Sequence, residues 1–320
     1  MASAVGVDLE KATSLLNAGG LVAMPTETVY GLAADGRNAK AVAQIFEAKG
    51  RPSFDPLILH FAELEHAQPY LAELPELLPR LYHALCPGPL TFIVKKTKKV
   101  PDIVTAGHAT VAIRFPKHPL AQKLLKKCNY PLAAPSANPF GAVSPTLASH
   151  VSAQLGDRVN YILDGGPCPV GVESTIIDLT QASPVVLRLG GSSLEEIESV
   201  LGQRITQVKT SSSNPKAPGM LSAHYSPGIK LLHGQLSQNL KLVNPARTGT
   251  ITFKARVPGI PVKNQRILSS AGILTEAAAE LFKALHSFNP QNTDVILAEL
   301  FPDEGLGRAI NDRLKRASVS

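Results

Sequence analysis

The chain has 320 residues, 44% hydrophobic and 18% charged, a composition that is ordinary for a globular protein and excludes a disordered or fibrous one. Its length predicts two domains. The net charge of +7 invites a nucleic-acid-binding function, but the absence of Trp argues against a single-strand binder built on stacked aromatic rings.

The first part of the chain alternates between helical and strand-like patterns. A helix is predicted over 8–18 from the spacing of its leucines, followed by an apolar strand at 20–24 and a second helix from an Asn38 cap to Gly50. Further predicted strands are 57–61, 91–94, 110–115, 132–134, 159–163, 174–179 and 185–189. Helices separate several of these strands, so we expect an α/β fold with a mixed sheet.

After residue 206 these patterns give way to Ser, Pro and Gly, which is linker composition. Periodic signals resume at 229, with strands at 250–253 and 295–300 and helices at 275–286 and 309–314. We therefore expect one domain over 1–206, a linker over 207–228 and a smaller α/β (Rossmann-like) domain over 229–320.

The excess positive charge lies in the C-terminal third. Residues 1–206 hold 18 Lys and Arg against 18 Asp and Glu, so the remaining residues hold 14 against 7. This basic region would suit RNA or another acidic partner, although a solvated surface that aids solubility is the simpler interpretation.

Cysteine use and hydropathy bear on the compartment. Cys86, Cys128 and Cys168 form no CxxC pair, which suits a reducing environment, and each is expected to be a small buried apolar residue. No apolar run is long enough to cross a membrane, and residues 1–12 carry no signal-peptide core. We expect a cytoplasmic protein with no membrane partner.

The sequence lacks the common signatures of nucleotide, zinc and triad enzymes: GxxxxGK[ST], GxGxxG after a strand, HExxH, GxSxG and metal-spaced Cys/His clusters. What remains is a set of segments at predicted strand ends, each with a polar or cationic group beside Gly or Pro. They are PTETVYG (25–31), KGRPSFDPLILH (49–60), TVAIRFPKHP (110–119), APSANPFGAVSP (134–145), VESTIIDL (172–179) and VVLRLG (185–190).

Two of these segments place an arginine, Arg114 or Arg188, in an otherwise apolar strand. Burying a guanidinium is costly unless an anion or carboxylate accompanies it. A single such arginine is more often an edge or salt-bridged residue, and PSANPFG alone is typical of a turn. Six segments in one domain nevertheless favour a shared ligand, a polyphosphate or nucleotide bound without a P-loop. The expected cations are Lys49, Arg51, Arg114 and Arg188, and the expected neutral donors are Ser136, Asn138, Ser144, Ser174 and Thr175.

The motifs PTETVYGL, KGRPSFDPLILH, APSANPFG, ESTIID and RLGG resemble, in order, those of the YrdC-like threonylcarbamoyl-AMP synthase family. PGMLSAHYSPG and DEGLGRAINDRLKRAS are similar to segments of its long form, which has an extra C-terminal domain. The resemblance spans nearly the whole chain. It implies a YrdC-like open twisted mixed sheet with helices.

The resemblance also implies a nucleotidyltransferase that makes L-threonylcarbamoyladenylate and pyrophosphate from L-threonine, bicarbonate (as CO₂) and ATP. The product would pass to a tRNA threonylcarbamoyl transferase complex, which modifies the adenosine beside the anticodon, and a direct tRNA contact is a further expectation.

Roles for single residues follow from the same resemblance. Arg114 would face the threonine carboxylate, where a planar two-donor group is suitable. Polar partners for the threonine hydroxyl would select against valine, because the wrong substrate would leave them unpaired. The implied threonine pocket is Thr28, Tyr30, His60, Arg114, Ala134 and Ser174. The implied ATP site is Lys49, Arg51, Asp55, Thr110, Ser136, Asn138, Ser144, Arg188 and Tyr225, with Lys49, Arg51 and Arg114 as the catalytic residues.

Asp55 departs from the family pattern, which usually has Asn before this Pro. An ionised Asp donates no hydrogen bond and repels phosphates unless Mg²⁺ or Lys49 intervenes. Mg²⁺ is expected to arrive with ATP, and no residue is assigned as its ligand. The HYSP segment of the linker is expected to fold over the nucleotide as a lid anchored by the second domain.

Other functions stay open at this point. A non-catalytic tRNA- or double-stranded-RNA-binding protein of the same fold would use the basic C-terminal domain, although the neutral charge balance of 1–206 does not suit a broad RNA surface. Carbamoyl transfer within a larger maturation protein would need zinc-finger or acylphosphatase-like segments, which the sequence lacks. A pure scaffold would leave the strand arginines unexplained.

Overall fold

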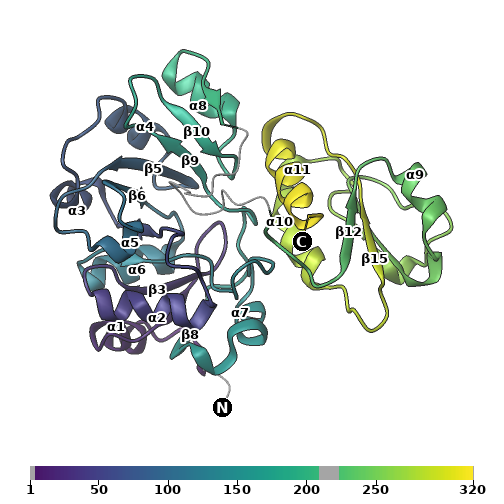
Figure 1. Ribbon diagram of the computed structural model, residues 1–320, viewed down its shortest axis with the longest axis horizontal. Coiled ribbons are helices and arrows are strands. Elements are labelled where there is room, and N and C mark those ends of the chain that lie inside the picture. The colour runs from purple at the N-terminus through teal and green to yellow at the C-terminus, as the bar shows by residue number, and fades with distance from the viewer. Residues whose placement is uncertain (1–3, 209–222, 320) are drawn as a thin grey trace.

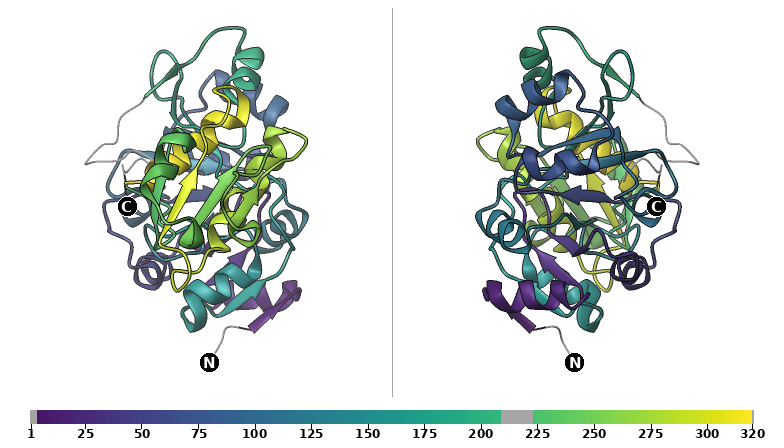
Figure 2. Two further views of the ribbon diagram at one scale, coloured as in Figure 1. Left: turned by 90° about the vertical axis from the view of Figure 1, so that its right-hand side faces the viewer. Right: turned by 90° about the vertical axis from the view of Figure 1, so that its left-hand side faces the viewer.

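The computed structural model describes residues 4–208 and 223–319, which form two units with one sheet each (Figure 1). The views along the long axis in Figure 2 show the C-terminal unit, green to yellow, stacked end to end with the first unit, purple to teal. Most of the predicted linker, 209–222, lies outside the described residues, so the predicted domain boundaries stay a prediction.

The first unit is built on an 11-stranded sheet that does not close on itself. Parallel pairs such as β4–β6 and antiparallel pairs such as β5–β6 occur in the same sheet, so the predicted open mixed α/β sheet is confirmed. In spatial order the strands are β1 (Ala4–Gly6), β8 (Tyr161–Leu163), β2 (Val22–Met24), β3 (Gly31–Asp35), β7 (Leu132–Ala133), β4 (Ile58–His60), β6 (Thr110–Arg114), β5 (Leu90–Lys95), β9 (Thr175–Asp178), β10 (Val185–Arg188) and β11 (Thr206–Gln207).

Successive residues of a strand point to opposite faces of the sheet. Both faces of this sheet carry apolar side chains, and helices cover both of them. In β2, Ala23 packs in one apolar cluster, whereas Val22 and Met24 pack in another. The first cluster includes α2 (Ala39–Lys49), α4 (Leu77–Leu85), α7 (Ala148–Leu155) and α8 (Leu194–Leu201); the second includes α1 (Leu9–Asn17) and α6 (Pro119–Cys128). Shorter helices are α3 (Leu64–Ala67), η1 (Gln68–Tyr70), α5 (Asp102–Thr105) and η2 (Gly156–Arg158).

The C-terminal unit has a four-stranded, all-parallel sheet in the order β12 (Lys230–His233), β15 (Val295–Ala298), β13 (Thr248–Thr252) and β14 (Gln265–Ile267). Its helices are α9 (Leu236–Asn239), η3 (Leu240–Leu242), η4 (Pro245–Arg247), η5 (Val262–Asn264), α10 (Leu274–His286) and α11 (Gly305–Ala317). Figure 1 shows α10 and α11 on the side that faces the first unit and α9 on the far side.

Local sequence signals explain where several elements begin and end. The Asn38 side chain accepts hydrogen bonds from the backbone N–H groups of Lys40 and Ala41, as its predicted role as a cap requires. Gly50 ends α2 with a left-handed φ of 61°. The sequence did not predict β3, because its residues are mostly buried on both faces and show no apolar–polar alternation. The expected burial of all three cysteines is wrong for Cys86, which is half-buried.

The two units share an apolar core. Val29, Val143 and Val172 of the first unit pack in the same cluster as Tyr225, Phe282 and the strands of the C-terminal unit. Within the described residues, no helix has the length and apolar character needed to cross a membrane.

Candidate active site

A narrow cavity lies where the C-terminal end of β6, the segments before β3 and β9, and residues 224–225 meet. Its volume is about 50 Å³, far below the roughly 300–1,000 Å³ of ordinary ligand pockets. The predicted site residues that line it are Arg51, His60, Arg114, Ala134, Ser136, Ser174, Arg188 and Tyr225. His224 of the predicted HYSP lid also lines it, as do Thr26 and Glu173, to which sequence reasoning assigned no role.

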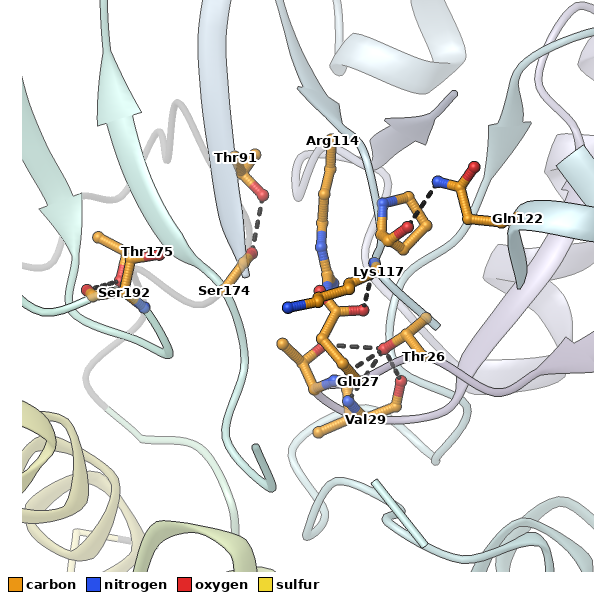
Figure 3. A network of polar contacts seen from close by, with 12 residues as sticks. Thr26, Glu27, Val29, Thr91, Arg114, Lys117, Gln122, Ser174, Thr175 and Ser192 are labelled. Atoms are coloured by element: carbon orange, nitrogen blue, oxygen red, sulfur yellow. Dashed lines mark hydrogen bonds and ion pairs between the residues drawn. The ribbon is translucent and has the colours of Figure 1, made fainter. Parts of the chain in front are cut away.

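Arg114 is buried and paired with a carboxylate from another segment. Its Nη2 lies 2.7 Å from Oε1 of Glu27, whose Oε2 accepts a hydrogen bond of 2.9 Å from the backbone N–H of Lys117. Figure 3 shows Arg114 between this segment and the Thr91–Ser174 pair. The buried Nε of Arg114 has no hydrogen-bond partner in the described structure. The protein itself thus supplies the carboxylate that the sequence argument required, and one donor stays available.

The turn that carries Glu27 is held by hydroxyl groups. Oγ1 of Thr26 accepts hydrogen bonds from the backbone N–H groups of Thr28 and Val29 and lies 2.9 Å from Oγ1 of Thr28 (Figure 3). Thr26 lines the cavity, whereas Thr28 is fully buried in the turn and does not. The structure therefore places Thr28 in a position that supports the turn, and its predicted contact with threonine stays a prediction.

Tyr30 likewise supports a loop. Its hydroxyl donates to the carbonyl of Gly166 at 2.8 Å and accepts from the backbone N–H of Gly165 at 3.1 Å. Burial raises its pKa above the usual tyrosine range. Tyr30 does not line the cavity, because this loop engages its hydroxyl; its contact with threonine stays a prediction.

His60 lies at the C-terminal end of β4, beside Arg114 of the neighbouring strand. Burial, reinforced by the charge of Arg114, lowers its pKa from 6.5 to about 3. The imidazole is therefore neutral at physiological pH. A neutral imidazole next to the guanidinium leaves the positive charge of this corner on Arg114 alone.

Arg188 and Ser174 form the opposite wall. The carbonyl of Ser174 accepts from Nε and Nη2 of Arg188 at 3.1 and 2.9 Å, and Oγ of Ser174 lies 2.7 Å from Oγ1 of Thr91. Burial lowers the pKa of Arg188 to about 10, so the guanidinium stays charged at neutral pH. The two strand arginines singled out in the sequence thus line one cavity.

Arg51 reaches the cavity from the loop after α2 and forms an ion pair with Asp55, the residue that departs from the family pattern. Its Nη2 lies 2.9 Å from Oδ2 of Asp55, and its Nε donates to the Asp55 carbonyl at 3.0 Å. Burial raises the pKa of Asp55 despite this pair. Asp55 does not line the cavity, and its Oδ1 is buried without a hydrogen-bond partner in the part of the chain described. The acidic side chain therefore neutralises Arg51 and does not face the space where phosphates would lie.

Four more predicted ATP residues, Lys49, Thr110, Asn138 and Ser144, do not line the cavity. Nζ of Lys49 donates to the carbonyls of Ser136 and Asn138, and burial followed by the charge of Arg51 lowers its pKa well below the usual value. The amide of Asn138 donates to carbonyls of its own loop. Thr110 begins β6, at the opposite end of the strand from Arg114. Lys49 and Asn138 therefore support the loop beside the cavity, and Thr110 lies away from it. Ser144 is described next.

A buried carboxylate in the cavity lining joins the two units. Oε1 of Glu173 accepts from Oγ of Ser144 at 2.6 Å, and its Oε2 accepts from Nε of Arg313 in α11 at 2.9 Å. Burial alone would raise the pKa of Glu173, but Arg313 and then Arg188 outweigh it and hold the pKa at about 2. Glu173 is in the quoted ESTIID segment and Arg313 in the quoted DEGLGRAINDRLKRAS segment. Neither was assigned a role, because arginines are common on exposed helix faces.

Tyr225 closes the cavity on the side of the C-terminal unit. It is 1% exposed and adopts a φ of 67°, rare for a residue other than Gly. Its ring lies 5.3 Å from that of Phe282 and 5.5 Å from the guanidinium of Arg313. The neighbouring His224 is buried too, which lowers its pKa to about 3. Of the predicted lid, residues 209–222 lie outside the described residues, but the HYSP segment packs at the site.

Comparisons with known proteins show what this chain is similar to. The sequence family described as "Telomere recombination" matches residues 14–190, and the family "Threonylcarbamoyl-AMP synthase, C-terminal domain" matches residues 192–319. The threonylcarbamoyl-AMP synthase of Pyrococcus abyssi is 41% identical over 96% of this chain and 93% of its own, and that of Bacillus subtilis is 40% identical over 97% and 92%. The crystal structure of P. abyssi Sua5 complexed with L-threonine superposes with a TM-score of 0.91 at 38% identity, covering 99% of this chain and 97% of that one.

Proposed function

This chain belongs to the threonylcarbamoyl-AMP synthase family, and from that premise we propose that it joins L-threonine, bicarbonate (as CO₂) and ATP into L-threonylcarbamoyladenylate, releasing pyrophosphate. The reaction is a nucleotidyl transfer, and its product serves the threonylcarbamoyl modification of tRNA by a downstream transferase. The observation that supports this most is the convergence of three buried guanidinium groups, Arg51, Arg114 and Arg188, on one cavity.

In the proposed threonine site, Arg114 binds the carboxylate. Its unpartnered Nε and its position at the cavity suit a charge-assisted hydrogen bond to an anion. Ser174, His60 and Ala134 line the same corner and give the substrate polar and small neighbours. Thr28 and Tyr30 act on this site through the turn at 26–29 and the loop at 164–166 that their hydroxyls hold.

In the proposed ATP site, Arg51, Arg188 and Ser136 face the phosphates, and Lys49 holds the loop carbonyls behind them. Mg²⁺ is proposed to enter with the nucleotide. Among the described residues no group of three or more His, Cys, Asp or Glu could hold a metal alone, which fits an ion carried by phosphates and water. When bound, the ion would neutralise phosphate charge.

The proposed chemistry has two steps. The amine nitrogen of threonine attacks the carbon of CO₂, forming a C–N bond and losing a proton, to give an N-carboxylate. An oxygen of that carboxylate then attacks the α-phosphorus of ATP, and the bond to the departing pyrophosphate breaks. Placement of the reactants by Arg114, together with charge neutralisation by Arg51 and Arg188, supplies most of the catalysis.

The cavity is too small for ATP while Tyr225 closes it, so we propose that the HYSP segment moves to admit the nucleotide and then returns. Closing would shield a water-labile mixed anhydride. Deletion of 207–320 tests the lid, and unchanged ATP affinity and turnover would refute it. Because the deletion also removes part of a shared core, Tyr225→Ala provides a milder test: faster loss of adenylate to hydrolysis is expected.

Threonine binding to the purified chain tests the substrate site directly. In a thermal-shift titration with L-threonine, serine and valine, threonine should raise the melting temperature most and valine least, because valine leaves buried polar groups unpaired. Equal shifts with all three amino acids would contradict the proposed selection. A steep salt dependence of tRNA affinity without pyrophosphate release would favour the RNA-binding alternative.

A further inference from the structure

In the parallel sheet of the C-terminal unit, the connections that leave the two central strands, β13 and β15, run toward opposite edges of the sheet. From β13 the chain passes to β14 at one edge of the sheet. From β15, which lies next to β13, it passes to α11, which packs against β12 at the other edge. In open parallel sheets, ligands bind outside the C-terminal ends of the strands at such a point.

A second cavity lies at this place. It is lined by residues that directly follow β13 and β15, with leucines of α9 and η3 as a wall, and its volume is about 730 Å³. That volume is within the roughly 300–1,000 Å³ of small-molecule sites. The cavity shares no lining residue with the candidate active site, and α9 is on the side of the C-terminal unit away from the first unit (Figure 1).

The cavity offers an apolar surface and an unused polar atom. The rings of Phe253 and Phe301 lie 5.3 Å apart in its lining, and Leu300 is 53% exposed. Thr252, the last residue of β13, is 1% exposed, and its Oγ1 has no hydrogen-bond partner in the described structure. A buried hydroxyl without a partner at a cavity wall is the arrangement that a ligand would complete.

Charged groups surround this surface. Lys254 and Arg256 follow β13 and are exposed, and neither forms an ion pair within the described residues. The Nζ of Lys254 lies 5.4 Å from the Phe253 ring. Glu299 follows β15, and its Oε2 accepts the backbone N–H of Phe253 at 2.8 Å, which holds the carboxylate at the cavity.

We propose that this cavity binds a free nucleoside phosphate, separately from the catalytic ATP. The base lies against Leu300 and the leucine wall, Thr252 and Glu299 take the polar groups of the sugar, and Lys254 and Arg256 take the phosphate. The combination of an apolar surface, a carboxylate and two cations without an ion pair in the described residues fits this ligand class better than a simple anion or an apolar molecule.

Photoaffinity labelling of the full chain with 8-azido-ATP, followed by peptide mapping, tests the proposal. Label is expected on peptides containing 252–258 or 299–302, in addition to peptides of the first unit, and excess ADP should suppress the former. Thr252→Val, which keeps the shape and removes the hydroxyl, and Arg256→Glu should each lower labelling of the C-terminal peptides at least about fivefold.

Lys230→Glu is the matched control, because Lys230 begins the edge strand β12, at the end of the parallel strands opposite to the cavity. It should leave labelling unchanged. Label confined to the first unit, or equal labelling of the C-terminal peptides in Thr252→Val, Arg256→Glu and Lys230→Glu, would overturn the proposal, as would a single-stranded RNA that competes at lower concentration than ADP. Loss of first-unit label alone would count against the catalytic site and leave this proposal standing.

Discussion

Each of the three buried arginines at the candidate active site has a different partner. Arg51 pairs with Asp55, Arg114 pairs with Glu27, and Arg188 donates to the carbonyl of Ser174. Without such partners, burial of a guanidinium would cost several kcal/mol. The protein's own groups therefore hold each of these cations in place, which is what electrostatic catalysis requires.

Replacing Arg114 by Lys should lower kcat/KM for threonine roughly 10- to 100-fold, because an ammonium cannot reproduce the planar fork that contacts Glu27 and is proposed to bind the substrate carboxylate. Steady-state kinetics with threonine as the varied substrate measure this effect. Arg37→Lys is the control, since Arg37 forms an exposed pair with Asp35. Equal effects of the two substitutions would contradict the role of Arg114.

His60 should make stability depend on pH. Its folded-state pKa of about 3 is below the ordinary 6.5, so the unfolded chain binds a proton that the folded chain does not. The contribution of neutral His60 to the free energy of unfolding is complete above about pH 6.5 and is lost as the pH falls toward 3. His60→Asn should reduce the slope of unfolding free energy against pH by up to about 1.4 kcal/mol per pH unit. Urea unfolding between about pH 7 and 5 measures it, and an unchanged slope would count against a neutral buried His60.

Sequence reasoning predicted best those residues whose burial carries a clear cost. Arg114 and Arg188 were noticed because a cation in an apolar strand needs a partner, and both line the cavity. It did not predict where the hydroxyls of Thr28 and Tyr30 point, because a hydroxyl satisfied by its own turn or loop has the same sequence pattern as one that binds a ligand.

At the scale of elements, helix α11 reaches from the C-terminal unit to the back of the active site. Arg313 on this helix is fully buried against Glu173, whereas Arg308 on the same helix forms an exposed pair with Glu195. The hydrophobic pattern of this helix predicted its existence. Which of its arginines is buried depends on how the helix packs against the first unit, so the sequence of the helix alone could not distinguish them.

Arg313→Met should destabilise the protein by roughly 3–5 kcal/mol, because it leaves the Glu173 carboxylate buried without its cation. Arg308→Met, the matched change on the same helix, should cost no more than about 1 kcal/mol. Chemical denaturation of the two variants side by side measures both values. Similar losses would show that the burial of Arg313 does not matter.

At the scale of the whole molecule, the two units behave as one body in this structure because they share a core. Gly171 of the first unit lies directly against α10: a Cβ there would come within 2.4 Å of Cα of Ala279. The sequence predicted two α/β units from its periodic segments and the Ser/Pro/Gly-rich stretch between them. The sequence did not indicate the contact between Gly171 and Ala279, because the two residues are more than 100 positions apart in the chain.

Gly171→Ala should therefore weaken the contact between the units and broaden or split the thermal transition. Gly166→Ala is its matched control, since Gly166 also has a positive φ but open space around a Cβ. Differential scanning calorimetry should give a single transition for the wild type and the Gly166 variant. Two separate transitions in the wild type would contradict a shared core.

Threonylcarbamoyl-AMP is proposed to form in the cavity bounded by Arg51, Arg114 and Arg188. Pyrophosphate release from the purified chain tests it most directly, with ATP, Mg²⁺, bicarbonate and L-threonine supplied together and then omitted one at a time. We predict release that requires every component, falls strongly when serine or valine replaces threonine, and is abolished in Arg114→Ala. Release that proceeds without threonine or bicarbonate, or no release from folded protein that binds tRNA, would contradict the account.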